Sequence, residues 1–597
     1  MDAFSQFLTQ QAQEKYANAV KLNDSECRND PETEPYKSKY KAREIWCELK
    51  SVVEDCCHDH PTDERWGFLK AALDLKLGIN YTDTEELGTG EEHLSKCVEL
   101  LQEHSLKERA CNVLQEALNQ LGILWTGRRQ PEKALGFLQR AEKLYKDFQH
   151  EVGGAPYTVD DLFTCDTSED DGAVAHRRSK HFENTYTHTL YYLAQVYGRL
   201  EESQKSAQYC HVTLRRQLET RTYQPVEWAL NAATLSQYYI TKPNFSMARH
   251  CMASATVVLK EAGEDDEKCS SQNCDGPKDL PRIWADLYRC WVKYGLQLLE
   301  TSWERLLDDS QDDDKQAKSE QQEQEEEEGA NKEGKEKDTL LTFDLELTAV
   351  EEQITDKFVL DYEQAREVFL TVQQWINKAQ EFYHIDDHCT DYTEIVQDHS
   401  RLYKQLIFFE GDYDRQCKMH KRRVDLLKNV LDQLNPQYYL LVCRQLMFEL
   451  AETYSAMLDL KLAAANETEA RPTARAMKKI NTLTQQSIDE FHKYIDSLRN
   501  PDKELPEKFG EDDERPVMIA HFCTGRLYSK FVEFDTRKRV ANLNKSVEHY
   551  KFLVDYCSRN PSAKEKVKAE YGICEEMVLL LPAKMDKILR EAEQINN

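Results

Sequence analysis

The chain has 597 residues, of which 31% are charged, and its formal net charge at pH 7 is -30. This acidic excess argues against nucleic acid and anionic membranes as main partners, because both require a basic surface, and makes a basic protein the natural complement. No segment approaches the roughly 20 apolar residues of a membrane span, and neither a secretory signal nor a disulfide framework is visible, so we expect a cytoplasmic protein.

The first segment with candidate chemistry is 51–64, which we expect to be a loop. It contains Cys56-Cys57-His58 and His60, with Cys47 upstream, which are residue types found in zinc sites. A structural zinc ion usually requires two separated ligand pairs, and adjacent cysteines rarely bind one ion tetrahedrally. We therefore predict no metal here, and no cofactor elsewhere in the chain.

A helical repeat begins at Leu121. The run Leu121-Gly122-Ile123-Leu124-Trp125 is followed at fixed offsets by Ala134, Leu138 and Ala141, which is the pattern of a tetratricopeptide unit. Small residues let two antiparallel helices approach closely, and the large apolar residues fill the seam between them. One such pair cannot bury its own apolar face, so several pairs must stack.

The pattern recurs with losses along the chain. Further copies begin at Leu77, Leu193, Leu235, Leu450 and Gly525. In the copy at Leu77 the second helix is expected late, after a longer turn. The copy at Leu193 has Ser206, Cys210 and Thr213 in its second helix, which makes it a polar and weakened version of the unit.

These copies predict an all-α fold, a right-handed α-solenoid of tetratricopeptide-like helical pairs in two stacks joined by a long linking helix. The expected parts are an N-terminal stack over 1–307, an acidic disordered insertion over 308–341, a linking helix region over 342–384 and a C-terminal stack over 385–597. Residues 308–338 hold fourteen Asp or Glu and five Lys, and so few apolar residues that they cannot support a core. Further loops are expected over 151–180 and 466–475.

The chain shows no motif of a known enzyme class. It lacks a Gly-rich phosphate loop, a Gly-x-Ser-x-Gly elbow and a His-Glu-x-x-His helix. We therefore predict a non-catalytic protein, with no catalytic residues. An enzyme whose site no motif announces stays open as an alternative.

The helical register predicts where a partner would bind. With Tyr197 and Tyr239 in the seams, aromatic and amide side chains of the neighbouring positions face the concave side, where such residues bind helices and loops. The predicted partner-binding residues are Asn119, His188, Tyr191, Tyr192, Gln195, Gln217, Asn231, Thr234, Gln237 and Tyr238. The alternative for the tyrosines is that they pack in the core.

Several strings in order along the chain then resemble a known family. They are residues 34–40, 80–87, 186–239, 418–423, 434–440 and 548–557. Together they resemble the kinesin-binding protein (KIF-binding protein) family.

The resemblance implies an all-α adaptor that binds the motor domain of a subset of kinesins, covers their microtubule-binding face and so blocks attachment to the track. It also implies a cytoskeleton-associated protein that affects microtubule organisation, axon outgrowth in differentiating neurons and mitochondrial transport. We expect a monomer when the protein is free. A scaffold for another basic partner, such as a chaperone or a transport adaptor, remains the alternative.

Overall fold

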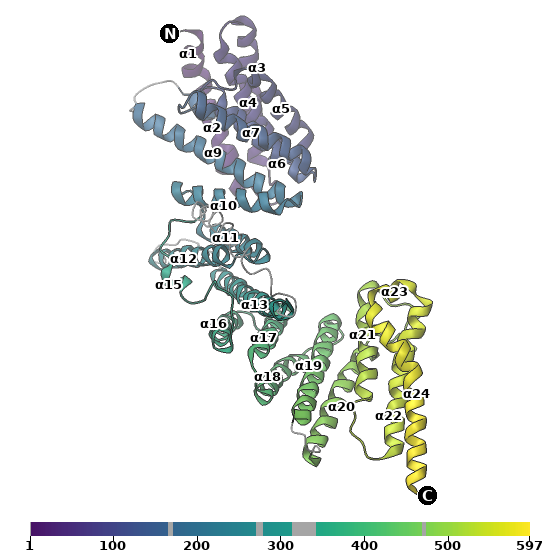
Figure 1. The fold of residues 1–597 in the computed structure, drawn as a ribbon. Helices are drawn as coiled ribbons and strands as arrows, with labels where there is room; N and C mark the ends of the chain where they lie inside the picture. The colour runs from purple at the N-terminus through teal and green to yellow at the C-terminus, as the bar shows by residue number, and fades with distance from the viewer. Residues whose placement is uncertain (1, 165–170, 270–278, 313–341, 468–472, 597) are drawn as a thin grey trace. The chain divides into compact units, whose positions relative to one another are not determined.

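The computed structural model describes residues 2–164, 171–269, 279–312, 342–467 and 473–596 (Figure 1). These residues form helices, turns and bends, and none of them lies in a strand. None of their helices is both long enough and apolar enough to cross a membrane. The predicted all-α solenoid is therefore confirmed.

The helices divide into two compact units. The first comprises residues 1–242, 250–268 and 324–347, and the second comprises 243–249, 269–323 and 348–597. Helix α13 (Leu280–Asp312) thus belongs to the second unit, although the predicted N-terminal stack extended to residue 307. Most of the predicted acidic insertion, residues 313–341, lies outside the described residues.

The first unit is a succession of antiparallel helices (Figure 1). In chain order they are α1 (Ala3–Phe7), a π-helical turn (Leu8–Ala12), α2 (Gln13–Asp24), α3 (Lys37–Asp59), α4 (Glu64–Asp83), α5 (Leu87–Leu101), α6 (Cys111–Gly127), α7 (Pro131–Glu151), α8 (Val159–Leu162), α9 (Asp171–Arg199), α10 (Ser203–Thr220) and α11 (Pro225–Thr241). Helix α12 (Phe245–Cys269) has residues 250–268 in the first unit and its two ends in the second.

The second unit continues in the same manner after α13. Its further helices are α15 (Thr348–Glu351), α16 (Tyr362–Gln380), α17 (Cys389–Phe409), α18 (Tyr413–Leu431), α19 (Leu440–Glu467), α20 (Ala474–Asp496), α21 (Glu511–Tyr528), α22 (Thr536–Arg559), α23 (Pro561–Lys566) and α24 (Lys568–Asn596). The linking region 342–384 is not one helix. The side chain of Asp361 accepts a hydrogen bond from the backbone N–H of Gln364 and so caps a new helix, α16.

Glycines of the repeat lie where two helices pack closely. A β-carbon on Gly122 of α6 would lie 2.7 Å from Leu138 of α7, and one on Gly78 of α4 would lie 2.7 Å from Leu94 of α5. In the second unit, a β-carbon on Gly525 of α21 would lie 2.8 Å from the ring of Tyr550 of α22. These contacts confirm the predicted role of the small residues in the helix seams.

The copy that begins at Leu77 has a regular second helix, contrary to the prediction. Gly90 follows Tyr81 by nine residues, as Ala134 follows Trp125, and its β-carbon position lies 3.0 Å from the carbonyl oxygen of Gly78. A glycine has taken the place of the expected alanine. The turn between α4 and α5 is therefore short, and the helix begins at Leu87.

Three copies have a serine hydrogen bond across the seam at one repeated position. The hydroxyl of Ser206 donates to the carbonyl of Ala194 at 2.8 Å, and that of Ser487 donates to the carbonyl of Ala451 at 2.7 Å. Ser546 donates to the carbonyl of Gly525 at 2.6 Å. A carbonyl oxygen has two lone pairs, so each of these can accept the serine in addition to its helical bond.

Two predicted loops are partly helical. Helix α3 continues to Asp59, so Cys56, Cys57 and His58 lie on its last turns, and α9 begins at Asp171. Hydrogen bonding along the helix continues through these polar residues because nothing in 51–59 breaks it, as glycine or proline would. Within the described residues, no group of three or more His, Cys, Asp or Glu side chains could hold a metal ion.

We predict opposite effects for two alanine substitutions at helical glycines. Gly122→Ala places a methyl group against Leu138 and should lower the free energy of unfolding by about 1–3 kcal/mol, the usual cost of overpacking. Gly136→Ala, on the exposed side of α7 with no atom within 4 Å of its β-carbon position, should raise it by about 0.5–1 kcal/mol. Urea denaturation measures both. Equal changes in the free energy of unfolding for the two variants would refute the close contact between Gly122 and Leu138.

Three histidines from consecutive helices lie together in the second unit. Nδ1 of His521 on α21 lies 3.0 Å from Nδ1 of His549 on α22, and the ring of His492 on α20 stacks on His549 with centroids 5.5 Å apart. Burial, with the charges of His492 and Lys545, lowers the pKa of His549 to about 4. Burial also lowers the pKa of His521 and of His492.

We predict that this cluster destabilises the folded chain in acid. The pKa of His549 in the folded state is about 4, below its value of about 6.5 in an unfolded chain, so the unfolded state binds the proton more tightly. Stability should therefore fall as the pH drops from about 6.5 toward about 4, by roughly 3 kcal/mol from this residue. His549→Asn should flatten that fall in urea denaturation series. An unchanged pH dependence in the variant would contradict the prediction.

Candidate partner-binding surface

A polar layer fixes α9 against α6. Nδ2 of Asn119 donates to the carbonyl of Thr185 at 3.2 Å, and the hydroxyl of Thr189 donates to Oδ1 of Asn119 at 2.9 Å. Nε2 of Gln115 donates to the same hydroxyl at 3.3 Å. Asn119 is only 5% exposed, so this predicted partner-binding residue is held inside the unit because its amide satisfies buried polar groups of α9.

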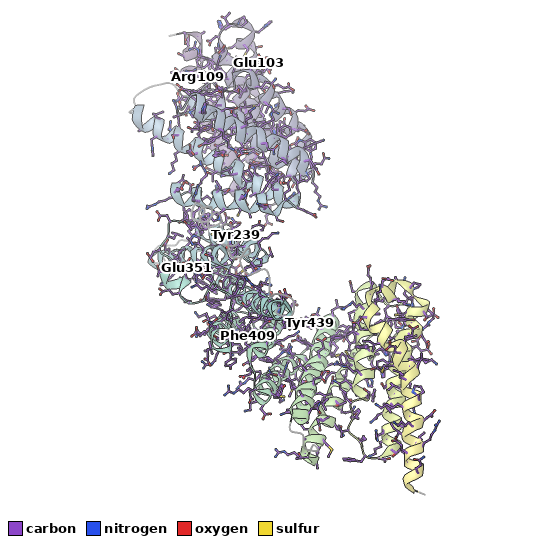
Figure 2. All side chains as sticks on the ribbon, viewed as in Figure 1. Glu103, Arg109, Tyr239, Glu351, Phe409 and Tyr439 are labelled. Atoms are coloured by element: carbon purple, nitrogen blue, oxygen red, sulfur yellow. The ribbon has the colours of Figure 1, made fainter. Side chains whose placement is uncertain are left out.

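The seam tyrosines lie where the repeat register places them. Tyr197 is 4% exposed, and Tyr239, which is labelled in Figure 2, is 9% exposed, so both are buried. The hydroxyl of Tyr197 accepts a hydrogen bond from Nε2 of Gln139 at 3.1 Å, and its ring stacks on Tyr209. This packing orients α9 and α11 so that their neighbouring residues face outward.

The other nine predicted residues are accessible. Those that are exposed are His188, Gln195 and Thr234. Those that are half-buried are Tyr191, Tyr192, Gln217, Asn231, Gln237 and Tyr238. We call these nine residues the α9–α11 surface. The core-packing alternative holds in part, because all three tyrosines of this surface are half-buried and Tyr192 packs against the buried cluster of α7 and α9.

Helix α11 is held beside α10 by a buried tryptophan. The indole N–H of Trp228 donates to the carbonyl of Leu214 at 3.0 Å, and Trp228 packs edge to face on Phe343. Phe343 also stacks on the ring of His211 of α10, with centroids 4.6 Å apart. The residues of α11 therefore have a fixed register against those of α10.

Four residues of the surface line one pocket of about 150 Å³. They are Tyr191 and Gln195 from α9, Gln217 from α10 and Asn231 from α11. The remainder of the lining, which sequence reasoning did not assign to a partner, is Ala194, Ser206, Cys210, Thr213 and Leu214. These four predicted residues thus meet at one place, although they come from three helices.

The charge of this region is locally balanced. None of the nine pocket-lining residues is charged. Glu183 of α9 pairs with Arg216 of α10, and Glu116 of α6 lies 2.8 Å from Nε2 of His181 and raises the pKa of that imidazole. The pocket therefore offers shape and neutral hydrogen-bonding groups rather than charge.

The second unit contains a larger recess, of about 1330 Å³, which sequence reasoning missed. Apolar side chains of Trp303, Phe408 and Leu441 line it, and Leu441 is 69% exposed. Asp398 and Glu452 also line it, and burial raises the pKa of both carboxyl groups. The one sequence feature that could have indicated this recess is the family-like string 434–440, which ends next to Leu441.

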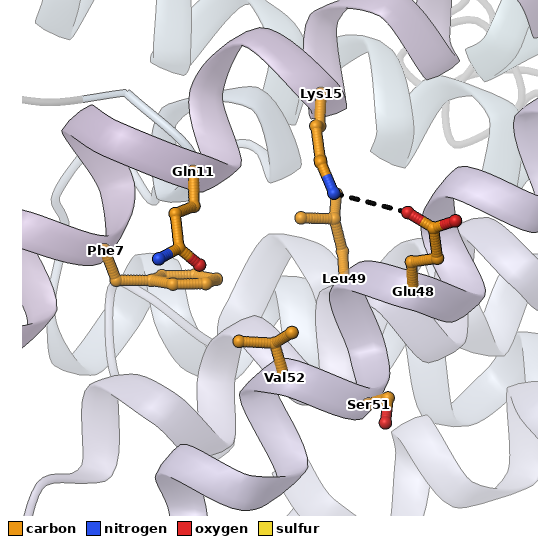
Figure 3. Close-up of a pocket in the computed structure, with 7 residues that line it drawn as sticks. All are labelled: Phe7, Gln11, Lys15, Glu48, Leu49, Ser51 and Val52. Carbon is orange, nitrogen blue, oxygen red and sulfur yellow. Dashed lines mark hydrogen bonds and ion pairs between the residues drawn. The ribbon is translucent and has the colours of Figure 1, made fainter.

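A third recess, near the N-terminus, offers less chemistry (Figure 3). It lies between the first helices and α3 and is lined by Phe7, Leu49 and Val52, with Nζ of Lys15 3.2 Å from a carboxylate oxygen of Glu48. Both ends of this ion pair are exposed, and such pairs contribute little. We do not assign it a function.

Comparison with known proteins covers nearly the whole chain. A family model described as KIF-1 binding protein C terminal matches residues 226–588. The chain is 45% identical to a KIF-binding protein of Gallus gallus and 40% identical to one of Homo sapiens, in each case over 96% of this chain and 97% of the relative. A KIF-binding protein of Drosophila melanogaster is 33% identical over 96% of both chains.

A solved structure agrees in fold as well. The structure described as a cryo-EM map of KIFBP superposes with a TM-score of 0.65 at 36% identity, covering 97% of this chain and 99% of that one. Sequence and fold therefore match over the same full length. The chain belongs to the KIF-binding protein family.

Proposed function

We propose that this chain is a non-catalytic adaptor that binds the motor domain of a subset of kinesins through the α9–α11 surface. One observation carries the proposal. Nine of the ten residues predicted for partner binding are accessible on three consecutive helices, in a chain whose relatives are named for kinesin binding. Tyrosine and amide side chains, which dominate this surface, are the types that anchor protein interfaces.

The proposed consequence is loss of track attachment. A motor face that holds acidic tubulin must be basic, and a chain with a net charge of -30 attracts such a face and speeds its capture. A motor whose track-binding face is covered cannot bind a microtubule. Effects on microtubule organisation, axon outgrowth and mitochondrial transport would follow from this competition in the cytoplasm.

The test is microtubule co-sedimentation of a panel of kinesin motor domains with and without the full chain. The wild-type chain should move at least one motor domain into the supernatant. A triple variant, Tyr192→Ala, Gln195→Ala and Thr234→Ala, should weaken binding of that motor domain by about 30-fold or more, as loss of an interface hot spot does.

A matched triple variant controls for general effects on the same helices. Lys180→Ala, Gln208→Ala and Glu227→Ala change exposed residues of α9, α10 and α11 outside the surface. This control should bind as the wild type does, and thermal denaturation should show that both triples are folded. Equal binding by the two triples would refute the assignment of the surface.

A second candidate function is a scaffold for a different basic protein. The observation that favours it is the recess of the second unit, whose lining combines apolar side chains with seven acidic residues and five basic ones. Pull-down with the full chain separates the two functions. Capture of a chaperone or transport adaptor by a chain that binds no motor domain of the panel would favour this candidate.

A further inference from the structure

We propose that the pocket between α9, α10 and α11 receives a single uncharged apolar side chain, aliphatic or phenyl, from a helix of the bound motor domain. This inference rests on the proposed function and names the anchor of that interface. The pocket is the place where four predicted residues meet, so an anchor there would lie at the centre of the contact.

The pocket exists because one position of the repeat is too small. In the pair α6 and α7 the seam is filled by Leu138, four residues after Ala134, against Gly122. The equivalent position in α10, four residues after Ser206, is Cys210. Ala194 takes the position of Gly122 and fills part of this seam, but cysteine is much smaller than leucine, and the pocket shows that a space remains.

The floor of this space is apolar. Ala194, Cys210 and Leu214 line it, and burial raises the pKa of the Cys210 thiol to about 11. The thiol is therefore neutral at pH 7 and behaves as a small apolar group with a weak hydrogen bond donor. A charged side chain would lose its hydration here without gaining a partner charge, which excludes lysine, arginine and carboxylate anchors.

The size of the pocket limits the occupant. Its volume of about 150 Å³ equals that of an engineered apolar cavity that binds benzene. Sites for cofactors and drug-sized ligands span about 300–1,000 Å³. One leucine, isoleucine, methionine or phenylalanine side chain fits, and a small-molecule cofactor does not.

The rim of the pocket suits a helical partner. Tyr191, Gln195, Gln217 and Asn231 place a phenol and three amides around the opening. Such groups can donate to and accept from the polar residues that flank an anchor on an amphipathic helix, where apolar positions recur every three or four residues. The occupant is therefore the apolar side of a helix that carries its charges elsewhere.

The decisive variant is Cys210→Leu, which restores the residue of the regular repeat. It should fold with a somewhat lower thermal stability, because Ala194 stands where Gly122 faces Leu138 and its methyl group crowds a leucine. It should also weaken binding of the motor domain that the wild-type chain captures by at least 10-fold, because the anchor is displaced. Cys210→Met, which is more flexible, replaces it if the leucine variant does not fold.

The control is Gln208→Leu, which adds the same side chain at an exposed position of α10. It should bind as the wild type does. Wild-type affinity in both Cys210 variants would overturn the pocket assignment but leave the α9–α11 surface intact. Absence of binding by the wild-type chain to every motor domain of the panel would instead refute the proposed function.

A double-mutant cycle identifies the partner's anchor. Exposed leucine, isoleucine, methionine and phenylalanine residues of the captured motor domain are changed to alanine one at a time. For the anchor, its loss and Cys210→Leu together should weaken binding no more than either change alone, because both empty the same contact. Additive losses for every residue scanned would overturn the inference.

Discussion

The structure depends on one packing constraint, the contact of a small residue in one helix with a large residue in the next. Gly78 against Leu94, Gly122 against Leu138 and Gly525 against Tyr550 repeat it in both units. Close approach lets each pair bury its apolar seam, and the pairs then bury their remaining faces by stacking, which is how a chain with 31% charged residues still forms a core. Where a serine lies in the seam, its hydroxyl also donates a hydrogen bond to a carbonyl of the facing helix.

The same constraint determines which residues are left for a partner. Burial of Tyr197 and Tyr239 in the seams turns the adjacent positions of α9 and α11 outward, and the buried amide of Asn119 fixes α9 on α6. The positions of these helices are thus set by contacts within the unit. A surface already held in place loses less conformational entropy on binding than a mobile one does.

Charge and contact have separate roles in this chain. The carboxylates beside the α9–α11 surface are paired, as Glu183 with Arg216 shows, and the pocket has an uncharged lining. Under the proposed function, long-range attraction by the acidic chain would raise the rate of encounter, and the neutral contact would determine which partner stays bound. A weakened repeat can therefore serve binding, since the smaller Cys210 provides space that leucine would remove.

Local periodicity and residue size at fixed offsets predicted most of the helices, their seams and the outward residues, although not the linking region, where a new helix begins after Asp361. Trp125, Tyr197 and Tyr239 could be placed in this way, and so could the nine accessible residues. The structure was needed to show that Asn119 is enclosed and that Tyr191, Gln195, Gln217 and Asn231 share a pocket. These features depend on distances between helices, which are set by the packing of residues far apart in the chain and leave no local pattern.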